Sequence, residues 1–103
     1  MERLTTDDRV RKYYALSHYL RYDTIMIMAR YGEPLSTGFL ASSVGVTDRL
    51  MRFHLSILKN KGGFITRSKF ERTVYWEINE EEVQYVIDDL ILILEENKNA
   101  KAK

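Results

Sequence analysis

Two short helical segments, each preceded by a capping residue and separated by one glycine, restrict most strongly what this chain can fold into. Ser36 precedes the segment TGFLASSV, and Thr47 precedes DRLMRFHLSILKN. A hydroxyl side chain at such a position accepts a hydrogen bond from the first turn of a helix. Gly45 lies between the two segments and favours a tight turn, because glycine tolerates left-handed backbone angles. The pattern predicts a helix-turn-helix whose second helix spans residues 47–60.

Two further helices are predicted before this pair. Apolar residues recur every three or four positions from Thr6 to Leu20, and either Thr5 or Thr6 can cap the first turn. The next helix spans residues 22–31 and ends at Gly32, which suits the left-handed position that follows a helix.

The apolar period changes from helical to alternating after residues 62–63, which are both glycine. The segments FITRS and TVYWEI are rich in β-branched and aromatic residues, and they predict a two-stranded hairpin joined by the charged link KFER. Asn79 can cap a last helix that runs to residue 97 and has three glutamates in its first turn. We therefore expect a mainly α fold with a small β-hairpin, in the order α-α-α-α-β-β-α.

The length and composition exclude several classes of protein. With 103 residues the chain has room for a single domain. The absence of cysteine excludes disulfides, thiolate zinc sites and cysteine nucleophiles. No apolar run reaches the roughly 18–20 residues that a membrane span needs, and the N-terminus is too polar for a signal peptide. We expect a cytoplasmic protein with no membrane partner.

Enzymatic chemistry has little support in the sequence. His18 and His54 are the only histidines, and the glycines form no phosphate-binding loop. The glutamates at 80–82 are explained by the start of a helix, and His54 is most simply a partly buried helix residue. We expect no enzyme, no cofactor and no metal site.

Positive and negative charges are segregated along the chain, although the net charge is only +1. Residues 1–79 have 13 Lys or Arg against 8 Asp or Glu, whereas residues 80–97 have seven acidic residues and no Lys or Arg. Residues 98–103 add three lysines and are predicted to form a basic, flexible tail. Such segregation indicates a polyanionic partner for the basic part of the chain.

The stretch VGVTDRLMRFHLSILKNKGGFITRSKFERTVYWEIN combines a glycine turn, a helix with His-Leu and a later leucine, a further glycine, and a tyrosine-bearing strand. In these motifs and in the order of its elements, the segment 21–79 resembles the winged-helix core of ArsR-type regulators. The flanking segments 5–20 and 79–97 resemble that family more loosely. Similar small winged helices occur in archaea and their viruses, so we expect an archaeal or viral origin.

The resemblance implies a DNA-binding mode. The helix 47–60 would enter the major groove, and the wing at 68–72 would lie along the backbone or the minor groove. The two outer helices would form a homodimer. Members of the family that sense metals use cysteines, or histidine and carboxylate ligands on the last helix. This chain has no cysteine and no histidine in that helix, so metal sensing is not expected.

The residues expected to contact DNA lie on this helix and on the wing. Met51, Leu55 and Leu58 recur on one side of the helix and predict its buried face. From residue 49 to residue 72 the chain has seven basic residues and one acidic residue. The alternative is that these charges only solvate an exposed face. The predicted DNA-binding residues are Thr47, Asp48, Arg49, Arg52, Phe53, Ser56, Lys59, Lys61, Arg67, Lys69 and Arg72.

Individual roles within this set differ. Arg49 and Arg52, one turn apart, can each make a two-pronged contact to guanine, whereas the lysines and the wing residues suit phosphates. Asp48 either complements the helix dipole, which we favour, or accepts a hydrogen bond from cytosine. Phe53 either contacts a thymine methyl group or packs against the wing, and we favour packing.

The last helix contains more apolar surface than is needed to cover one face of a small domain. Its segment LILIL is wider than a single helical stripe. We expect a homodimer interface formed by Val10, Tyr13, Tyr14, Val83, Val86, Ile87, Leu90, Ile91, Ile93 and Leu94. The alternative is that the first helix covers the last within one chain.

These patterns together predict a sequence-specific, double-stranded DNA-binding transcriptional regulator that acts as a homodimer. Two alternatives remain, because a fold alone does not determine function. One is an architectural protein that binds DNA without sequence preference, and the other is a winged helix that contacts proteins.

Overall fold

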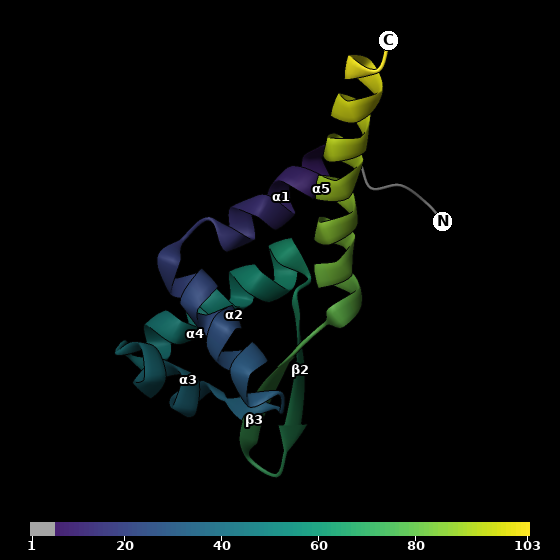
Figure 1. Ribbon diagram of the computed structural model, residues 1–103. Coiled ribbons are helices and arrows are strands. Elements are labelled where there is room, and N and C mark those ends of the chain that lie inside the picture. The colour runs from purple at the N-terminus through teal and green to yellow at the C-terminus, as the bar shows by residue number, and fades with distance from the viewer. Residues whose placement is uncertain (1–5) are drawn as a thin grey trace.

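Five α-helices, one π-helical turn and three strands make up the computed structural model, which describes residues 6–103 (Figure 1). In chain order they are α1 (Thr6–Leu16), α2 (Tyr19–Tyr31), β1 (Leu35–Ser36), α3 (Thr37–Val44), α4 (Asp48–Ile57), η1 (Leu58–Gly62), β2 (Ile65–Phe70), β3 (Thr73–Ile78) and α5 (Glu80–Lys101). The predicted fold class, a mainly α winged helix-turn-helix with a small β element, is confirmed. The candidate cap Thr5 lies outside the described residues.

The caps that predicted the helix-turn-helix are present. The Ser36 hydroxyl accepts a hydrogen bond from the backbone N–H of Phe39 at 3.1 Å. The Thr47 hydroxyl accepts one from the N–H of Leu50, also at 3.1 Å. Gly45 adopts the left-handed conformation with φ 77°, which turns the chain between α3 and α4. These local hydrogen bonds fix where the recognition helix α4 begins.

The boundary between the first two helices differs from the prediction. α1 ends at Leu16 and α2 begins at Tyr19, so the predicted helix to Leu20 is wrong and the predicted start of the second helix is three residues late. His18 is the reason, because its Nδ1 atom accepts a hydrogen bond from the N–H of Leu20 at 3.1 Å and so caps α2. Histidine is not among the preferred capping residues, and the sequence pattern did not indicate this break.

The last helix is longer than predicted, and it starts differently. α5 runs to Lys101, so the predicted tail is wrong for residues 98–101, which are helical. No glycine or proline interrupts that segment, and lysines in a last turn suit the negative end of the helix dipole. The Asn79 side chain makes no capping hydrogen bond in the described structure, contrary to expectation. Instead, the Asn79 backbone N–H donates to the carbonyl of Phe64 at 2.7 Å.

The sheet contains one strand more than the predicted hairpin. β2 and β3 pair antiparallel, from Ile65 opposite Ile78 to Phe70 opposite Thr73. β1 adds to the other edge of β3, which makes the strand order β1-β3-β2. A strand of two residues is too short to show alternation, so periodicity could not predict it.

The core lies between the helices and the inner face of the sheet. Its fully buried large side chains include Met28, Leu40, Phe64 and Ile65, together with the three residues predicted for the inner face of α4, namely Met51, Leu55 and Leu58. Trp76 on β3 is also buried, and its indole N–H donates to the Thr37 hydroxyl at 2.9 Å.

A buried lysine joins three elements around this core. The Lys12 ammonium of α1 donates to the Gly62 carbonyl of η1 at 2.8 Å and forms an ion pair with Glu82 of α5. A buried ammonium needs such partners, because it loses its hydration when the chain folds. Lys12 therefore joins α1 and α5 to η1, which follows α4.

Replacement of Gly62 by alanine should destabilise the protein. An added Cβ atom would lie 2.8 Å from Cε2 of Phe64 and 2.9 Å from Cβ of Ala15, closer than real contacts allow. We expect Gly62→Ala to lower the free energy of unfolding by about 1–3 kcal/mol, measured by urea denaturation. Gly38→Ala is the matched control, because its nearest atom would be 3.9 Å away. Equal stability of Gly62→Ala and the unmodified protein would contradict this packing.

Candidate nucleic-acid interface

The outer side of α4, η1 and the β2–β3 hairpin form one exposed, mostly basic surface, which we call the basic face. All the residues predicted to bind DNA are exposed on it, namely Thr47, Asp48, Arg49, Arg52, Phe53, Ser56, Lys59, Lys61, Arg67, Lys69 and Arg72. Ser56 accepts a hydrogen bond from the Asn60 side chain at 3.1 Å. Exposure leaves these side chains available to a partner, and their contact with DNA remains a prediction.

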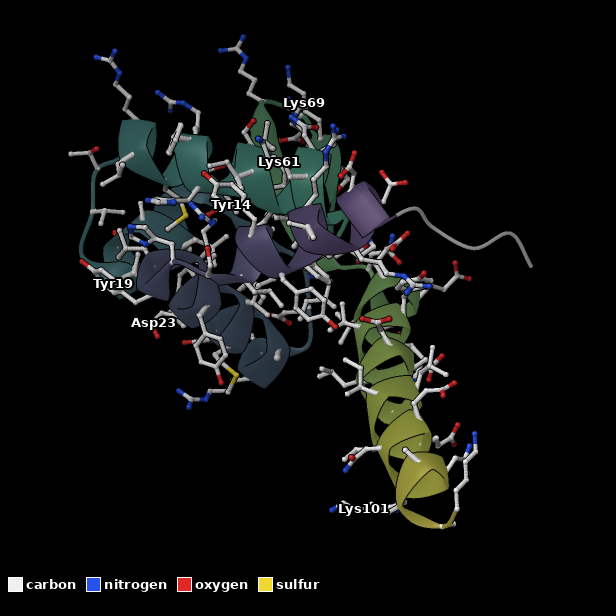
Figure 2. All side chains as sticks on the ribbon, turned by 90° about the horizontal axis from the view of Figure 1, so that it is seen from above. Tyr14, Tyr19, Asp23, Lys61, Lys69 and Lys101 are labelled. Carbon is white, nitrogen blue, oxygen red and sulfur yellow. The ribbon has the colours of Figure 1, made fainter. Side chains whose placement is uncertain are left out.

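The hairpin places its basic residues in register. Arg67 stands opposite Trp76 and Lys69 stands opposite Val74, so both side chains belong to the sheet face that bears Ile65. In Figure 2, Lys61 and Lys69 lie on the same side of the molecule, whereas Lys101 lies at the far end of α5. η1 lies at the start of β2 and the turn of the wing lies at its other end (Figure 1), so the basic residues of η1 and of the wing turn are separated by the length of this strand.

The turn of the wing is shorter than the predicted link KFER. Lys69 and Phe70 belong to β2, so only Glu71 and Arg72 connect the strands. Glu71 is in the left-handed region with φ 57°, which costs a residue with a Cβ atom about 1 kcal/mol. A turn of two residues keeps Arg72 next to the strand ends.

The structure shows the surroundings of Asp48 and Phe53, for each of which the sequence left two roles open. Asp48 lies in the first turn of α4, near Gly38 of α3, a position that suits the helix dipole. Phe53 is 58% exposed, and its ring meets the His54 ring edge-on at 5.4 Å. The favoured expectation that the wing covers Phe53 is wrong, because most of its side chain remains open to solvent.

Sequence reasoning missed two exposed apolar residues on the elements that form this surface. Leu50 on α4 and Phe70 at the end of β2 are both exposed. Strand alternation places Phe70 on the face opposite that of Lys69, which is the signal that could have identified it. Leu50 directly follows Arg49, and no comparable pattern in the sequence indicated that its side chain would be exposed.

A buried polar cluster behind α4 was also missed. Arg21 of α2 is only 3% exposed, and its guanidinium meets Nδ1 of His54 at 3.1 Å. Burial lowers the pKa of His54, and the nearby His18 and Arg21 lower it further. Arg21 lies three residues before the buried Thr24, on the inner stripe of α2, and this spacing was the available signal. His54 is almost fully buried rather than partly buried as expected.

A second exposed surface lies on α5, and we call it the apolar stripe. Its members Ile87, Leu90, Ile91, Ile93 and Leu94 are 45–59% exposed. Figure 1 shows that the C-terminal half of α5 projects beyond the other elements. Val10, Tyr13 and Tyr14 of α1 are exposed as well, whereas Val83 and Val86 pack in part against the core of their own chain.

α1 touches α5 through polar contacts. The Tyr13 hydroxyl donates to Asp89 at 2.6 Å, and Arg9 forms an ion pair with the same carboxylate at 3.5 Å. The hydrogen bond to Asp89 raises the pKa of Tyr13 to about 12. α1 therefore covers α5 near Asp89, but it leaves the apolar stripe open.

Across residues 6–103, no three His, Asp or Glu side chains are placed to hold a metal ion. In the same part of the chain, no helix is both long enough and apolar enough to cross a membrane.

Solved structures with a similar fold are described as transcriptional regulators. No family model matches the chain, and no curated protein matches it significantly in sequence. An ArsR-like transcriptional regulator from Rhodococcus sp. RHA1 is similar with a TM-score of 0.80 at 21% identity, over 92% of this chain and 87% of that one. A homodimeric winged helix-turn-helix DNA-binding domain from Mycobacterium bovis has a TM-score of 0.69 at 17% identity, over 92% of each chain.

The transcriptional repressor PagR of Bacillus anthracis is similar as well, with a TM-score of 0.64 at 17% identity over 81% of this chain and 92% of that one. At these identities the likeness establishes the fold alone. The chain has the winged-helix fold of ArsR-type regulators, as its sequence motifs predicted.

Proposed function

We propose that this chain is a sequence-specific regulator of transcription that binds double-stranded DNA as a homodimer. The observation that supports this most is the basic face, on which exposed arginines of α4 and basic residues of the wing lie together. The structural neighbours are described as transcriptional regulators, which also favours a non-enzymatic role. Such a regulator acts in the cytoplasm, associated with the nucleoid.

α4 is the element proposed to enter the major groove, together with the adjoining residues 58–60. The groove is about 12 Å wide and accommodates one helix. Arg49 and Arg52 lie one turn apart on the exposed side of α4, where each can donate two hydrogen bonds to a guanine. Ser56 lies one turn further along, and Phe53 can contact a thymine methyl group.

The wing and η1 are proposed to hold the DNA backbone. Lys59 and Lys61 follow α4, whereas Lys69 and Arg72 lie at the wing. Phosphate contacts from these residues orient the protein without reading sequence, and they make binding sensitive to salt. The wing at 68–72 lies along the backbone or in the minor groove.

The apolar stripe is proposed to form the dimer interface together with the exposed residues of α1. A contiguous apolar surface of this kind is costly in water unless another surface covers it. A twofold axis through α5 would repeat α4, and half-sites one DNA turn apart are separated by about 34–36 Å. The homodimeric description of the Mycobacterium bovis domain supports this arrangement.

One observation favours a different use of the same fold. Leu50 and Phe53 are exposed apolar residues of α4 within the basic face, and Phe70 is exposed on the other face of the wing. Aromatic residues are enriched where proteins contact proteins, so these residues favour a winged helix that binds another protein. A non-specific architectural DNA binder is the other alternative, and it requires only the positive charge of this surface.

Arg49→Ala and Arg52→Ala should reduce sequence preference. Each loses a two-pronged base contact, worth about 1–3 kcal/mol, or about 5- to 150-fold in affinity for the preferred site. Fluorescence anisotropy with the preferred and a scrambled duplex measures this. Lys101→Ala, at the far end of α5, is the control and should change affinity less than about twofold. Equal losses on both duplexes would favour the architectural alternative, and the absence of duplex binding by the unmodified protein would favour the protein-contact module.

Ile91→Glu should convert the dimer into a monomer. The substitution places a carboxylate within the apolar stripe, where a partner subunit would have to bury it at a cost of several kcal/mol. Sedimentation equilibrium at micromolar concentration should show a dimer for the unmodified protein and a monomer for the variant. Asn99→Glu adds the same charge on the side of α5 that bears Asp88, and this control should remain dimeric. A monomeric unmodified protein would contradict the proposed assembly.

A further inference from the structure

The buried Arg21 of α2 contacts α4 through His54. Nε of Arg21 donates to the Ala15 carbonyl at 2.8 Å, and one terminal nitrogen donates to the Tyr14 carbonyl at 3.2 Å. The other terminal nitrogen meets Nδ1 of His54 at 3.1 Å. All three acceptors are neutral, so these hydrogen bonds and the Tyr14 ring over the guanidinium stabilise the buried charge of Arg21.

This geometry determines the protonation state of His54. A guanidinium has donors and no acceptor, so Nδ1 of His54 must be the bare nitrogen of a neutral imidazole with its proton on Nε2. A second proton on His54 would occupy Nδ1 and remove the side-chain acceptor that Arg21 contacts among residues 6–103. It would also place two positive charges within hydrogen-bond distance in a buried site.

The second histidine of the chain belongs to the same cluster. The His18 ring lies 4.8 Å from the His54 ring, and its Nδ1 accepts the hydrogen bond from the N–H of Leu20 that caps α2. His18 therefore also uses Nδ1 as an acceptor. A proton at that nitrogen would remove the cap and add a positive charge facing His54.

Three elements meet at this cluster. Arg21 lies on α2, its carbonyl partners Tyr14 and Ala15 lie on α1, and His54 lies on α4 between Phe53 and the fully buried Leu55. The contact between Arg21 and His54 thus ties the recognition helix to the two helices behind it. Its loss would remove one contact that positions α4, while the Thr47 cap and the buried Met51, Leu55 and Leu58 would keep the helix in the core.

We propose that Arg21, His18 and His54 form a proton-sensitive anchor, in which protonation of His54 releases the recognition helix and weakens DNA binding. Arg21 is a positioning residue in this arrangement, since it acts on the DNA-binding helix only through His54. The DNA half of the proposal rests on the proposed function, whereas the movement of α4 does not.

The charged groups that face His54 disfavour its protonation. Arg21 faces it from α2, and His18 faces it from the turn between α1 and α2. The Tyr14 ring lies over the Arg21 guanidinium at 5.2 Å, and the Lys61 ammonium lies 5.2 Å from the same ring, which adds a further positive charge near Arg21. These groups oppose a proton on His54.

The direction in which stability changes with pH follows from the lowered pKa of His54. Burial lowers the pKa of His54 in the folded chain below the value of about 6.5 that it has when unfolded. The contribution of the neutral imidazole to stability is fully present above that value, and it is lost as pH falls toward the folded pKa of His54. Acid therefore favours the state in which the contact with Arg21 is broken.

The test combines DNA affinity with a reporter on the free protein, both measured at pH 7.5 and 5.5. Affinity is measured for a 30-base-pair duplex of random sequence. Amide chemical shifts of residues 48–57 report the position of α4. His54→Asn keeps an acceptor near the place of Nδ1 but does not titrate, whereas His18→Asn keeps His54 and supplies a good helix cap.

We expect the affinity of the unmodified protein to fall at pH 5.5 by up to about tenfold, because this pH lies one unit below the ordinary pKa of about 6.5 and one proton changes affinity by at most about tenfold per pH unit. His54→Asn should bind equally well at pH 7.5 and change less than about twofold. His18→Asn should remain sensitive to pH. Equal pH dependence of His54→Asn and the unmodified protein, or no dependence in either, would overturn the proposal.

The amide shifts separate this proposal from the proposed function. If the protein binds no duplex at any pH, the proposed function fails. Movement of the α4 amides with the titration of His54 would then still support the anchor, and unmoved amides would overturn it. This reporter uses the unmodified chain, so it remains decisive even if His54→Asn does not fold.

Discussion

The recognition helix depends on one buried stripe, and the rest of the structure is arranged around it. Met51, Leu55 and Leu58 are completely buried, which determines how α4 is rotated about its own axis. Because a helix turns 100° per residue, burying these three side chains directs Arg49, Arg52 and Ser56 outward. The Thr47 cap fixes where α4 begins, and the π-helical turn at its end places Lys61 beside Tyr14 of α1.

The distribution of charge matches this arrangement. Basic residues gather on α4, η1 and the hairpin, whereas the acidic residues of α5 serve other purposes. Glu82 pairs with the buried Lys12, and Asp89 accepts the Tyr13 hydroxyl and pairs with Arg9. The acids thus attach α5 to α1 and leave the basic face nearly free of negative charge. One long helix can then contribute to the domain through its N-terminal half and present the apolar stripe with the remainder.

Local signals predicted much of the fold, because the caps and turns are decided by neighbouring residues. Ser36, Gly45 and Thr47 act within a few positions of themselves, and the inner face of α4 follows from periodicity alone. The features that the sequence did not predict include contacts between residues distant in sequence. His18 caps α2 against the usual preferences, β1 forms only because β3 lies beside it, and Arg21 meets His54 from 33 positions away. The outward residues of the candidate site were predictable, but the buried cluster that supports them was not.

DNA binding with sequence preference is the central claim, and one titration of the unmodified protein tests it most directly. The protein would be titrated against a duplex from the region upstream of its own gene and against a random duplex of equal length, at two salt concentrations. The proposed function predicts at least about a thousandfold preference for one specific site, with affinity for both duplexes falling as salt rises. Equal affinity for the two duplexes would contradict sequence-specific regulation at that region, and no binding to either would contradict DNA binding altogether.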